Sequence, residues 1–231
     1  MANQAQTSFA VPPGAMRLTL VRHGQTQGLP EGGSFDLKHG HGDPLLTDLG
    51  HQQAQAVGER LQHEVIDALY VTSLTRTHET AAPLAELTGM QPIEEHELRE
   101  VFLGDWEGGK FRSMLAALEH PGAIAFRQTY EWGSVPGAET NAELAERTSD
   151  AVKRLFAQHT DQHVVAVVHG GVVAALCAYA NDCHMRGFAG SDNCAIHRLV
   201  VTEDRWFLRA FNDTNHLGGL GSPPAEIVAH A

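Results

Sequence analysis

The amino-acid sequence predicts an α/β protein whose mostly parallel sheet is covered by helices on both faces. Short apolar segments typical of buried strands alternate along the chain with segments of helical periodicity, and this alternation is typical of parallel sheets. The chain has 231 residues, of which 42% are hydrophobic and 19% charged, so it can bury the core of one α/β domain.

Short apolar runs carry the strand predictions. The run HVVAVV at 163–168 is very apolar and predicts a buried strand. Two later runs lie close together in the sequence and predict a terminal hairpin. The predicted strands are 17–21, 67–71, 92–95, 163–168, 195–201 and 206–211.

Helical spacing and capping residues carry the helix predictions. Thr47 and Thr140 each precede a segment of helical character and are suitable N-caps. Gly89 ends the second predicted helix, and Ser73 is a candidate cap at its start. The predicted helices are 47–62, 75–88, 141–158 and 172–180, with one or two more within 108–132.

Three segments lack periodicity. Residues 27–43 are rich in Gly and His and predict a long loop. Residues 1–15 predict a loose N-terminal tail, and residues 218–231, with three glycines and two prolines, predict an irregular C-terminal tail. The remaining 16–217 then form the domain.

Charge and cysteine content narrow the classes of function. The net charge of −12 disfavours nucleic acid and anionic membranes as partners, although a locally positive pocket can still bind an anionic substrate. The three cysteines show no CxxC spacing, and their odd number fits a reducing compartment, so we expect a cytoplasmic protein. No apolar run approaches the roughly 20 residues of a membrane span, and residues 1–15 do not resemble a signal peptide.

Two strands are each predicted to end in a histidine that is followed by glycine. Arg22-His23-Gly24 follows the first strand, where open parallel sheets place their ligand crevice. A neutral imidazole is a nucleophile, and a neighbouring guanidinium can bind two phosphate oxygens. His169 and Gly170 follow the strand 163–168 and open a helix, whose first amides attract anions. A surface His–Arg pair and an ordinary polar strand end are the competing interpretations.

Two further segments offer a second cation and an acid. Arg76 is predicted in the first turn of a helix, where the helix dipole disfavours a cation unless an anion lies nearby. Glu100 precedes Val101 and Phe102, and a carboxyl group beside apolar residues can protonate a leaving alkoxide. An exposed helix arginine and a solvated acidic turn remain the competing interpretations of these residues.

Together these segments resemble the histidine phosphatase superfamily, also called the phosphoglycerate mutase-like family. The segment LVRHGQT resembles its RHG signature, and further similar segments follow in order between residues 18 and 217. They are GDPLLTDLGHQQA, VTSLTRTHETA, LREVFLGDWEG, PGAET, VVHGG and FNDTNHL.

The resemblance implies a three-layer α/β/α sandwich and a phosphatase that hydrolyses phosphomonoesters of small metabolites through a phosphohistidine. It implies His23 as nucleophile and Glu100 as general acid and then base, with no metal and no cofactor. It allows a homodimer. The implied phosphate-binding residues are Arg22, Arg76, His169, Gly170, Gln25 and Thr26.

The loop after the nucleophile departs from the family pattern. Leu29 stands where many members carry an asparagine that faces the phosphate, and the loop 27–42 is a few residues longer than usual. Because an anionic oxygen removed from water needs a donor, we expect His39 or His41 to supply it. Activity would then rise as the pH falls from about 7 toward 6.

Three other functions compete with hydrolysis. A bisphosphoglycerate-dependent mutase is disfavoured because only residues 109–135 separate the acid segment from the PGGES-like turn. A non-catalytic module that binds a phosphorylated ligand is compatible with the same fold. A zinc hydrolase would use His39, His41 and Asp43 as ligands.

Overall fold

A six-stranded sheet forms the centre of the computed structural model, which describes residues 7–29 and 32–221. The strand order is β5-β4-β6-β1-β7-β8, and the first four strands are parallel while β7 and β8 each run antiparallel to the strand before them. The mostly parallel sheet is therefore confirmed. The strands are β1 (Met16–Arg22), β4 (Ala68–Val71), β5 (Ile93–Glu94), β6 (His163–Val168), β7 (Ile196–Val201) and β8 (Trp206–Asp213).

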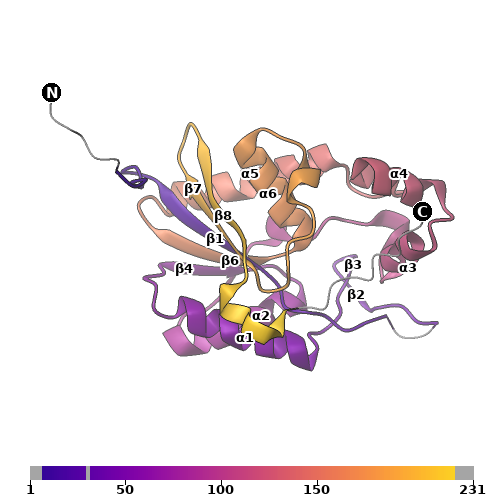
Figure 1. Cartoon of the computed structure of the whole chain (residues 1–231), viewed down its shortest axis with the longest axis horizontal. Helices are drawn as coiled ribbons and strands as arrows, with labels where there is room; N and C mark the ends of the chain where they lie inside the picture. Colours follow the sequence, from indigo (N-terminus) through magenta and orange to yellow (C-terminus); the bar gives the residue numbers. More distant parts are fainter. Residues whose placement is uncertain (1–6, 30–31, 222–231) are drawn as a thin grey trace.

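Helices cover both faces of this sheet, which confirms the three-layer α/β/α architecture. Helices α1 and α2 lie on one face, and α5 and α6 on the other (Figure 1). Helices α3 and α4 extend the second layer past the end of β1 (Figure 1). The α-helices are α1 (Asp48–Leu61), α2 (Thr75–Thr88), α3 (Lys110–Ala117), α4 (Pro121–Thr129), α5 (Asn141–Gln158) and α6 (Gly170–Asn181). Short 3-10 helices are η1 (His96–Leu98), η2 (Gly104–Trp106), η3 (Trp132–Ser134), η4 (Met185–Phe188) and η5 (Asn215–Leu220).

The apolar side chains of β6 contribute to two hydrophobic cores. Alternate side chains of a strand point to opposite faces. Val164, Ala166 and Val168 accordingly pack in the core under α5 and α6, whereas Val165 and Val167 pack in the core over α1 and α2. Burial on both faces is why this strand is continuously apolar rather than alternating.

Most of the predicted helix ends are confirmed. Thr47 accepts a hydrogen bond from the Gly50 amide, and Thr140 forms a reciprocal capping box with Glu143. Gly89 ends α2 with a φ of +71°, a left-handed conformation that favours glycine.

The predicted cap at Ser73 was wrong. The N-cap of α2 is Leu74, which makes no side-chain capping bond. The Asp43 carboxylate instead accepts from the Thr75 amide at 2.9 Å and from the Thr75 hydroxyl at 2.6 Å. Asp43 therefore caps α2 although it lies 32 positions away in the chain, and sequence spacing could not indicate this contact.

The segment predicted as a long loop, 27–43, contains a small antiparallel hairpin. Its strands are β2 (Leu37–Lys38) and β3 (His41–Gly42). The two turn residues, His39 and Gly40, both have positive φ, at +51° and +84°. Two-residue hairpin turns of this kind match the right-handed twist of the strands. Such short strands carry too few residues to show a periodicity.

Parts of both predicted tails, at Phe9 and at residues 218–220, contact the domain. The Phe9 ring lies against Phe207, with Arg209 stacked above it. Toward the other end η5 continues to Leu220 and packs on α1, with a non-helical kink at Gly218. The other residues of the predicted tails, 1–6 and 222–231, lie outside the described part of the chain.

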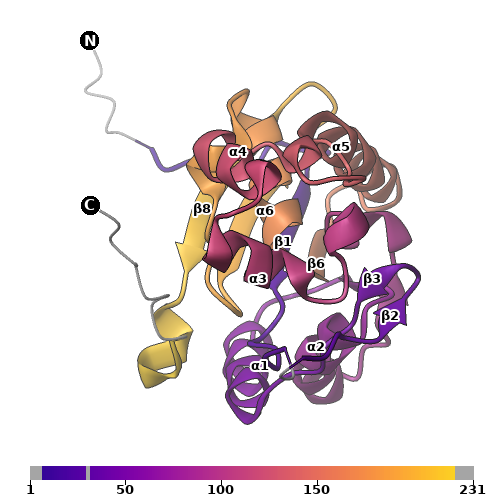
Figure 2. The same ribbon diagram turned by 90° about the vertical axis from the view of Figure 1, so that its right-hand side faces the viewer.

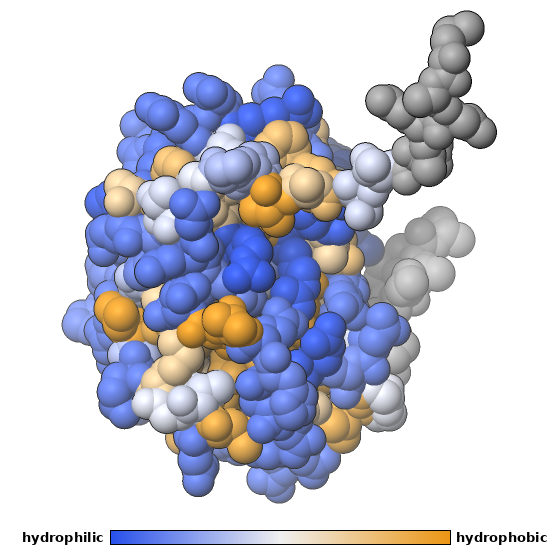
Figure 3. Space-filling model, turned by 90° about the vertical axis from the view of Figure 1, so that its left-hand side faces the viewer, coloured by the Kyte–Doolittle hydropathy of each residue, from blue (hydrophilic) through white to orange (hydrophobic). Residues whose placement is uncertain are grey.

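The face of the domain that lies away from the cavity is mostly polar. Figure 3 shows the end of the molecule remote from α3 and the β2–β3 hairpin, where hydrophilic side chains surround small scattered hydrophobic spots. None of the helices within residues 7–29 and 32–221 combines the length and the apolar content needed to cross a membrane.

The core predicts a clear contrast between two leucines. Leu155 on α5 is 1% exposed, whereas Leu87 on α2 is 44% exposed. Leu155→Ala should therefore lower the free energy of unfolding by about 2–5 kcal/mol, since it leaves a cavity. Leu87→Ala should change it by less than about 0.5 kcal/mol. Urea denaturation of both variants measures the difference, and equal effects would contradict the burial described above.

Candidate active site

Pairing of two parallel strands brings the two motif histidines together. Strands β1 and β6 are neighbours, with Arg22 opposite Val168, so both end at the same edge of the sheet. The His23 amide donates to the Val168 carbonyl at 2.9 Å, and His169 follows directly. The ring centroids of His23 and His169 are 5.3 Å apart.

A cavity of about 240 Å³ opens at this edge. Figure 2 faces this end of the molecule, where α3, β3 and the end of β1 lie close together. Residues from several elements line the cavity, and they bring three guanidinium and two imidazole groups together with the carboxyl groups of Glu100 and Glu107. The polar lining includes Arg22, His23, His41, Arg76, Glu100 and Arg112.

The His23 imidazole is oriented and neutral. It is 6% exposed, and its Nδ1 donates to the Gly24 carbonyl oxygen at 2.8 Å, which leaves Nε2 with a free lone pair. Burial, followed by the positive charges of Arg76 and Arg22, lowers the pKa of His23 well below its ordinary value. The imidazole is therefore uncharged at neutral pH, as a nitrogen nucleophile requires.

Glycine after His23 permits a close backbone approach. A Cβ atom at Gly24 would lie 2.6 Å from the carbonyl oxygen of Gly50 in the first turn of α1. The Gly24 amide donates to Thr80 Oγ1 on α2 at 2.9 Å. The nucleophile loop is thus fixed between α1 and α2, and no larger residue fits at this position.

His169 and Arg22 present buried polar atoms that have no partner among the described residues. His169 is fully buried, and its Nε2 is 3.0 Å from Thr72 Oγ1, while Nδ1 is unpaired. Arg22 donates from Nη1 to the Ser191 carbonyl, while its Nε is unpaired. Burial and the nearby Arg76 lower the pKa of His169 well below its ordinary value. Unpaired buried groups at one site indicate a ligand, and an oxyanion would satisfy donors of this kind.

Arg76 lies where the sequence indicated, in the first turn of α2, and the anion that this position needs is Asp43. The Arg76 guanidinium is 3.7 Å from Asp43 Oδ1, and both side chains are buried. Arg76 Nη1 also donates to the Gly42 carbonyl at 3.0 Å. The β3 strand and the residue after it therefore aim this guanidinium at the cavity.

Glu100 is held by the start of α6. Its Oε1 accepts from the Gly171 amide at 3.1 Å and from the Val101 amide at 3.0 Å, so Oε2 is the oxygen left for a ligand. A Cβ atom at Gly171 would lie 2.6 Å from Oε1, which explains the second glycine after His169. We expected the first amides of this helix to bind phosphate, but the Gly171 amide is used to orient the carboxyl group.

Of the other residues predicted to bind phosphate, Thr26 lines the cavity, whereas Gln25 and Gly170 do not. Thr26 lines the cavity, and its hydroxyl accepts from Arg112 Nη2 at 3.2 Å. Gln25 does not line it, because its side chain accepts from the Thr47 hydroxyl at 2.8 Å. A Cβ atom at Gly170 would lie 3.5 Å from Arg22 Nε, so Gly170 lies behind that guanidinium.

The structure separates His39 and His41, either of which was expected to reach the phosphate. His39 is exposed, and its ring packs edge-on against His96 in a neighbouring groove rather than in the cavity. His41 does line the cavity, but its Nε2 accepts from Arg99 Nε at 3.2 Å and its Nδ1 is 3.5 Å from Glu107 Oε1. The turn of the β2–β3 hairpin turns one histidine outward, and the network around Glu107 engages the other.

The same geometry bears on the zinc alternative. Both carboxylate oxygens of Asp43 are engaged with Thr75, and one faces Arg76, while His39 points away. Within the described part of the chain no three His, Cys, Asp or Glu residues are grouped so that they could hold a metal ion.

Sequence reasoning missed one cation and understated the role of an aromatic pair. Arg112 on α3 is exposed at the rim of the cavity, and no carboxylate pairs with it among the described residues. Phe111 and Trp132 line the cavity, and their ring centroids are 5.2 Å apart. A basic residue in a helix outside the regular alternation was the available signal for Arg112.

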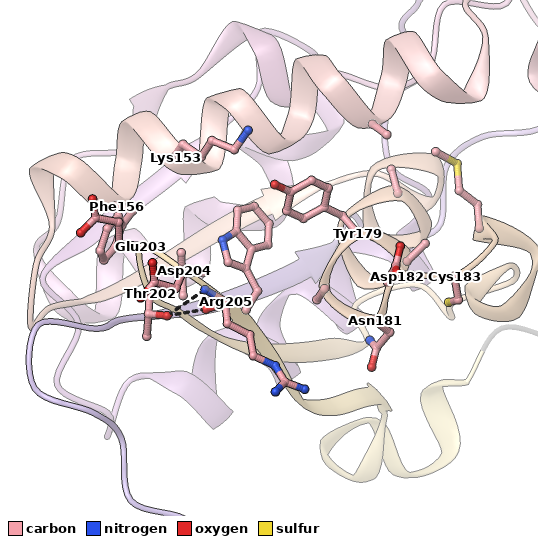
Figure 4. A pocket seen from close by; sticks show the side chains of 17 residues that line it. Lys153, Phe156, Tyr179, Asn181, Asp182, Cys183, Thr202, Glu203, Asp204 and Arg205 are labelled. Carbon is pink, nitrogen blue, oxygen red and sulfur yellow. Dashed lines mark hydrogen bonds between the residues drawn. The ribbon is translucent and has the colours of Figure 1, made fainter.

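A larger hollow of about 1040 Å³ lies elsewhere, between α5, the end of α6 and the β7–β8 turn (Figure 4). Lys153 pairs with Asp150 at 2.8 Å, and the Thr202 hydroxyl bonds to the backbone of Arg205 across the turn. No histidine is among the described residues that line it. Size and chemistry therefore point to different hollows, and chemistry favours the smaller one.

Comparisons with known proteins agree with the motifs and the fold. A sequence model of the histidine phosphatase superfamily (branch 1) matches residues 18–214. Glucosyl-3-phosphoglycerate phosphatase of Mycolicibacterium vanbaalenii is 35% identical over 170 residues, which cover 70% of this chain and 72% of that protein. Phosphoglycerate mutase-like protein 4 of Arabidopsis thaliana is 32% identical over 209 residues, or 88% of each chain. The native structure of a mycobacterial glucosyl-3-phosphoglycerate phosphatase superposes with a TM-score of 0.72 and 29% identity, covering 87% of this chain and all of that one.

Buried neutral histidines predict a loss of stability in mild acid. Burial lowers the pKa of His197 from 6.5 to about 4, and the pKa values of His23 and His169 are also lowered. Below pH 6.5 these histidines are protonated in the unfolded chain but stay neutral in the folded chain. The free energy of unfolding therefore falls as the pH is lowered from 6.5 to 4. Each such histidine contributes a slope of about 1.4 kcal/mol per pH unit.

Urea titrations at several pH values measure this slope. His197→Gln should reduce it by about one histidine's share, whereas His51→Gln, at an exposed position on α1, should leave it unchanged. Equal slopes in the wild type and the His197 variant would show that His197 is not buried in its neutral form.

Proposed function

Because the chain belongs to the histidine phosphatase superfamily, we propose that it is a metal-independent phosphatase that hydrolyses phosphomonoesters of small metabolites through a phosphohistidine at His23. One observation carries the proposal: a buried, neutral imidazole leaves its Nε2 free in a cavity that also holds the guanidinium groups of Arg22 and Arg76 and the Glu100 carboxyl group. Nucleophile, phosphate-binding cations and acid are thus within one small space.

The first half of the reaction transfers the phosphoryl group to the enzyme. The Nε2 lone pair of His23 attacks phosphorus in line with the ester oxygen, and the bond between phosphorus and that oxygen breaks. Glu100 gives its proton to the departing oxygen, so the product leaves as a neutral alcohol. The Gly24 carbonyl keeps the proton on Nδ1 during the attack and stabilises the positive charge that the ring acquires.

The second half returns the enzyme to its starting state. A water molecule gives a proton to the Glu100 carboxylate and attacks the phosphorus, and the bond to His23 Nε2 breaks. Inorganic phosphate leaves, His23 is neutral again and Glu100 is protonated for the next cycle. The same carboxyl group serves as acid and then as base, which requires that it reach both the leaving oxygen and the incoming water.

Fixed hydrogen-bond donors, two of them positively charged, supply the stabilisation of the transition state. In this proposal Arg22, Arg76 and the neutral His169 bind the three equatorial oxygens, whose charge changes during transfer. Each group is oriented beforehand: Arg22 by the Ser191 carbonyl, Arg76 by Gly42 and Asp43, and His169 by Thr72. Little rearrangement is then needed at the moment of reaction.

The rim of the cavity supports a substrate with a second acidic group. Arg112 carries a charge that no carboxylate neutralises among the described residues, beside the apolar wall of Phe111 and Trp132. A small carboxylate-bearing phosphomonoester fits this combination. The named phosphatases among the relatives support the same class, since one acts on glucosyl-3-phosphoglycerate.

Replacing His23 should remove activity without unfolding the protein. We expect His23→Ala to lower phosphate release from p-nitrophenyl phosphate by at least about 10³-fold, the scale of losing a covalent nucleophile. His51→Ala, on the surface of α1, is the control and should keep wild-type rates.

Rapid acid-free quenching with ³²P-labelled substrate should also trap an alkali-stable label on the wild type and none on His23→Ala. Normal turnover without His23 would refute the mechanism. Trapped label that is passed to a second phosphoglycerate faster than it is hydrolysed would instead identify a mutase.

Arg112 should affect carboxylate-bearing substrates selectively. We expect Arg112→Met to lower kcat/KM for 3-phosphoglycerate by about 10-fold, the loss of one charge-assisted contact, and to change kcat/KM for p-nitrophenyl phosphate little. Arg127→Met, at an exposed position on α4, serves as the control for loss of a surface charge. An equal loss with both substrates would mean that Arg112 contacts the phosphoryl group instead.

A further inference from the structure

Arg147 on α5 makes a set of contacts that the reaction described above does not use. Its side chain is 10% exposed and forms a two-point ion pair with Glu139, with Nε and Nη2 each 2.8 Å from a carboxylate oxygen. Its third nitrogen, Nη1, donates to the carbonyl of Glu97 at 2.5 Å and to that of Arg99 at 3.1 Å. One guanidinium therefore joins α5 to the backbone immediately before Glu100.

Glu139 binds the same segment on the other side of Glu100, at Phe102. The Glu139 amide donates to the Phe102 carbonyl at 3.0 Å, and Glu139 Oε2 accepts from the Phe102 amide at 3.3 Å. Glu139 directly precedes Thr140, the capped start of α5. The pair Arg147–Glu139 thus holds the chain at residues 97, 99 and 102, on both sides of Glu100.

Core packing anchors the neighbours of Glu100, but it does not by itself fix the Glu100 carboxyl group. Leu98 and Val101 are each 1% exposed and anchor the segment in the hydrophobic core under α6. The segment between β5 and α3 contains only the short 3-10 turns η1 and η2, so the sheet supplies no backbone bonds to Glu100. The carboxyl group depends on its side-chain contact with Gly171 and on what fixes its backbone.

We propose that Arg147 and Glu139 are positioning residues that keep the Glu100 carboxyl within reach of the leaving oxygen. This rests on the proposed function, and it extends that function to residues outside the cavity lining. Neither residue lines the cavity, and neither touches the phosphoryl group. Loss of the clamp should therefore impair the protonation of the leaving group and spare the nucleophile and the phosphate-binding cations.

Two substrates that differ in their leaving groups separate these effects. p-Nitrophenolate leaves without a proton near neutral pH, whereas the oxygen of benzyl phosphate must be protonated as it leaves. Because kcat/KM reports the steps through phosphorylation of His23, its ratio for the two substrates measures acid catalysis. The ratio does not depend on the fraction of enzyme that is folded, since both substrates are assayed on one preparation.

We expect Arg147→Met to lower kcat/KM for benzyl phosphate by about 30-fold and for p-nitrophenyl phosphate by less than about 3-fold, because general acid catalysis supplies about 10²–10⁴-fold. Glu139→Gln keeps an acceptor for the Phe102 amide but loses the ionic clamp, and it should shift the ratio in the same direction. It carries the test if Arg147→Met does not fold. Glu100→Gln should show the full shift.

A double variant and a matched control complete the experiment. In the Glu100→Gln background, Arg147→Met should cause no further change in the ratio, because the two residues act as one unit. Arg154→Met is the control: Arg154 lies on the same helix, is half exposed and pairs with Glu95 at 3.2 Å, but no hydrogen bond or ion pair links it to residues 97–102. Its ratio should equal that of the wild type.

The outcomes distinguish the clamp from the underlying function. If the wild type releases phosphate and needs His23, but Arg147→Met and Glu139→Gln leave the ratio unchanged, the clamp is purely structural and the proposal is wrong. Equal losses with both substrates in these variants would also overturn it. If the wild type hydrolyses neither substrate and takes no label on His23, the proposed function itself fails.

Discussion

Parallel hydrogen bonding between β1 and β6 places His23 and His169 side by side, and the rest of the site is arranged around this pair. Both strands run in the same direction and end in register, so each delivers an imidazole to the same edge of the sheet. Glycines shortly after each histidine let a neighbouring element approach closely: the start of α1 at Gly24, and the Glu100 carboxyl at Gly171, two residues after His169. A displacement of either strand would separate His23, His169 and Glu100 from one another.

Electrostatics at this edge follows from burial. The imidazoles of His23 and His169 lie near the guanidinium groups of Arg22 and Arg76. Burial and these positive charges both lower the pKa values of the two imidazoles, which therefore stay uncharged. The site therefore combines a neutral nucleophile with positive charge, although the whole chain carries a net charge of −12. Asp43 offsets part of the repulsion by pairing with Arg76 at 3.7 Å, and it also caps α2. One carboxylate thus holds a helix and a catalytic-site cation in place.

The two layers of helices serve the site differently. Helices α1 and α2 fix the nucleophile loop through Gly50 and Thr80 and supply Arg76. The opposite layer holds the acid segment, through the Gly171 amide of α6 and the Arg147 side chain of α5. Helix α3 closes the rim with Arg112. The nucleophile and the acid are therefore supported from opposite faces of the sheet.

The sequence by itself determined the strand–helix alternation, most helix ends and the residues with chemistry at strand ends, because these depend on local periodicity and on caps such as Thr140 with Glu143. Ordered motifs also identified Arg22, His23, Arg76, Glu100 and His169, all of which meet at one edge. Contacts between residues distant in the chain were decided only by the tertiary structure. The cap of α2 comes from Asp43, the Gly171 amide goes to Glu100, and His39 turns outward while His41 joins Arg99 and Glu107. A side chain's partner across the fold depends on where the backbone carries both residues, and no spacing along the chain records that distance.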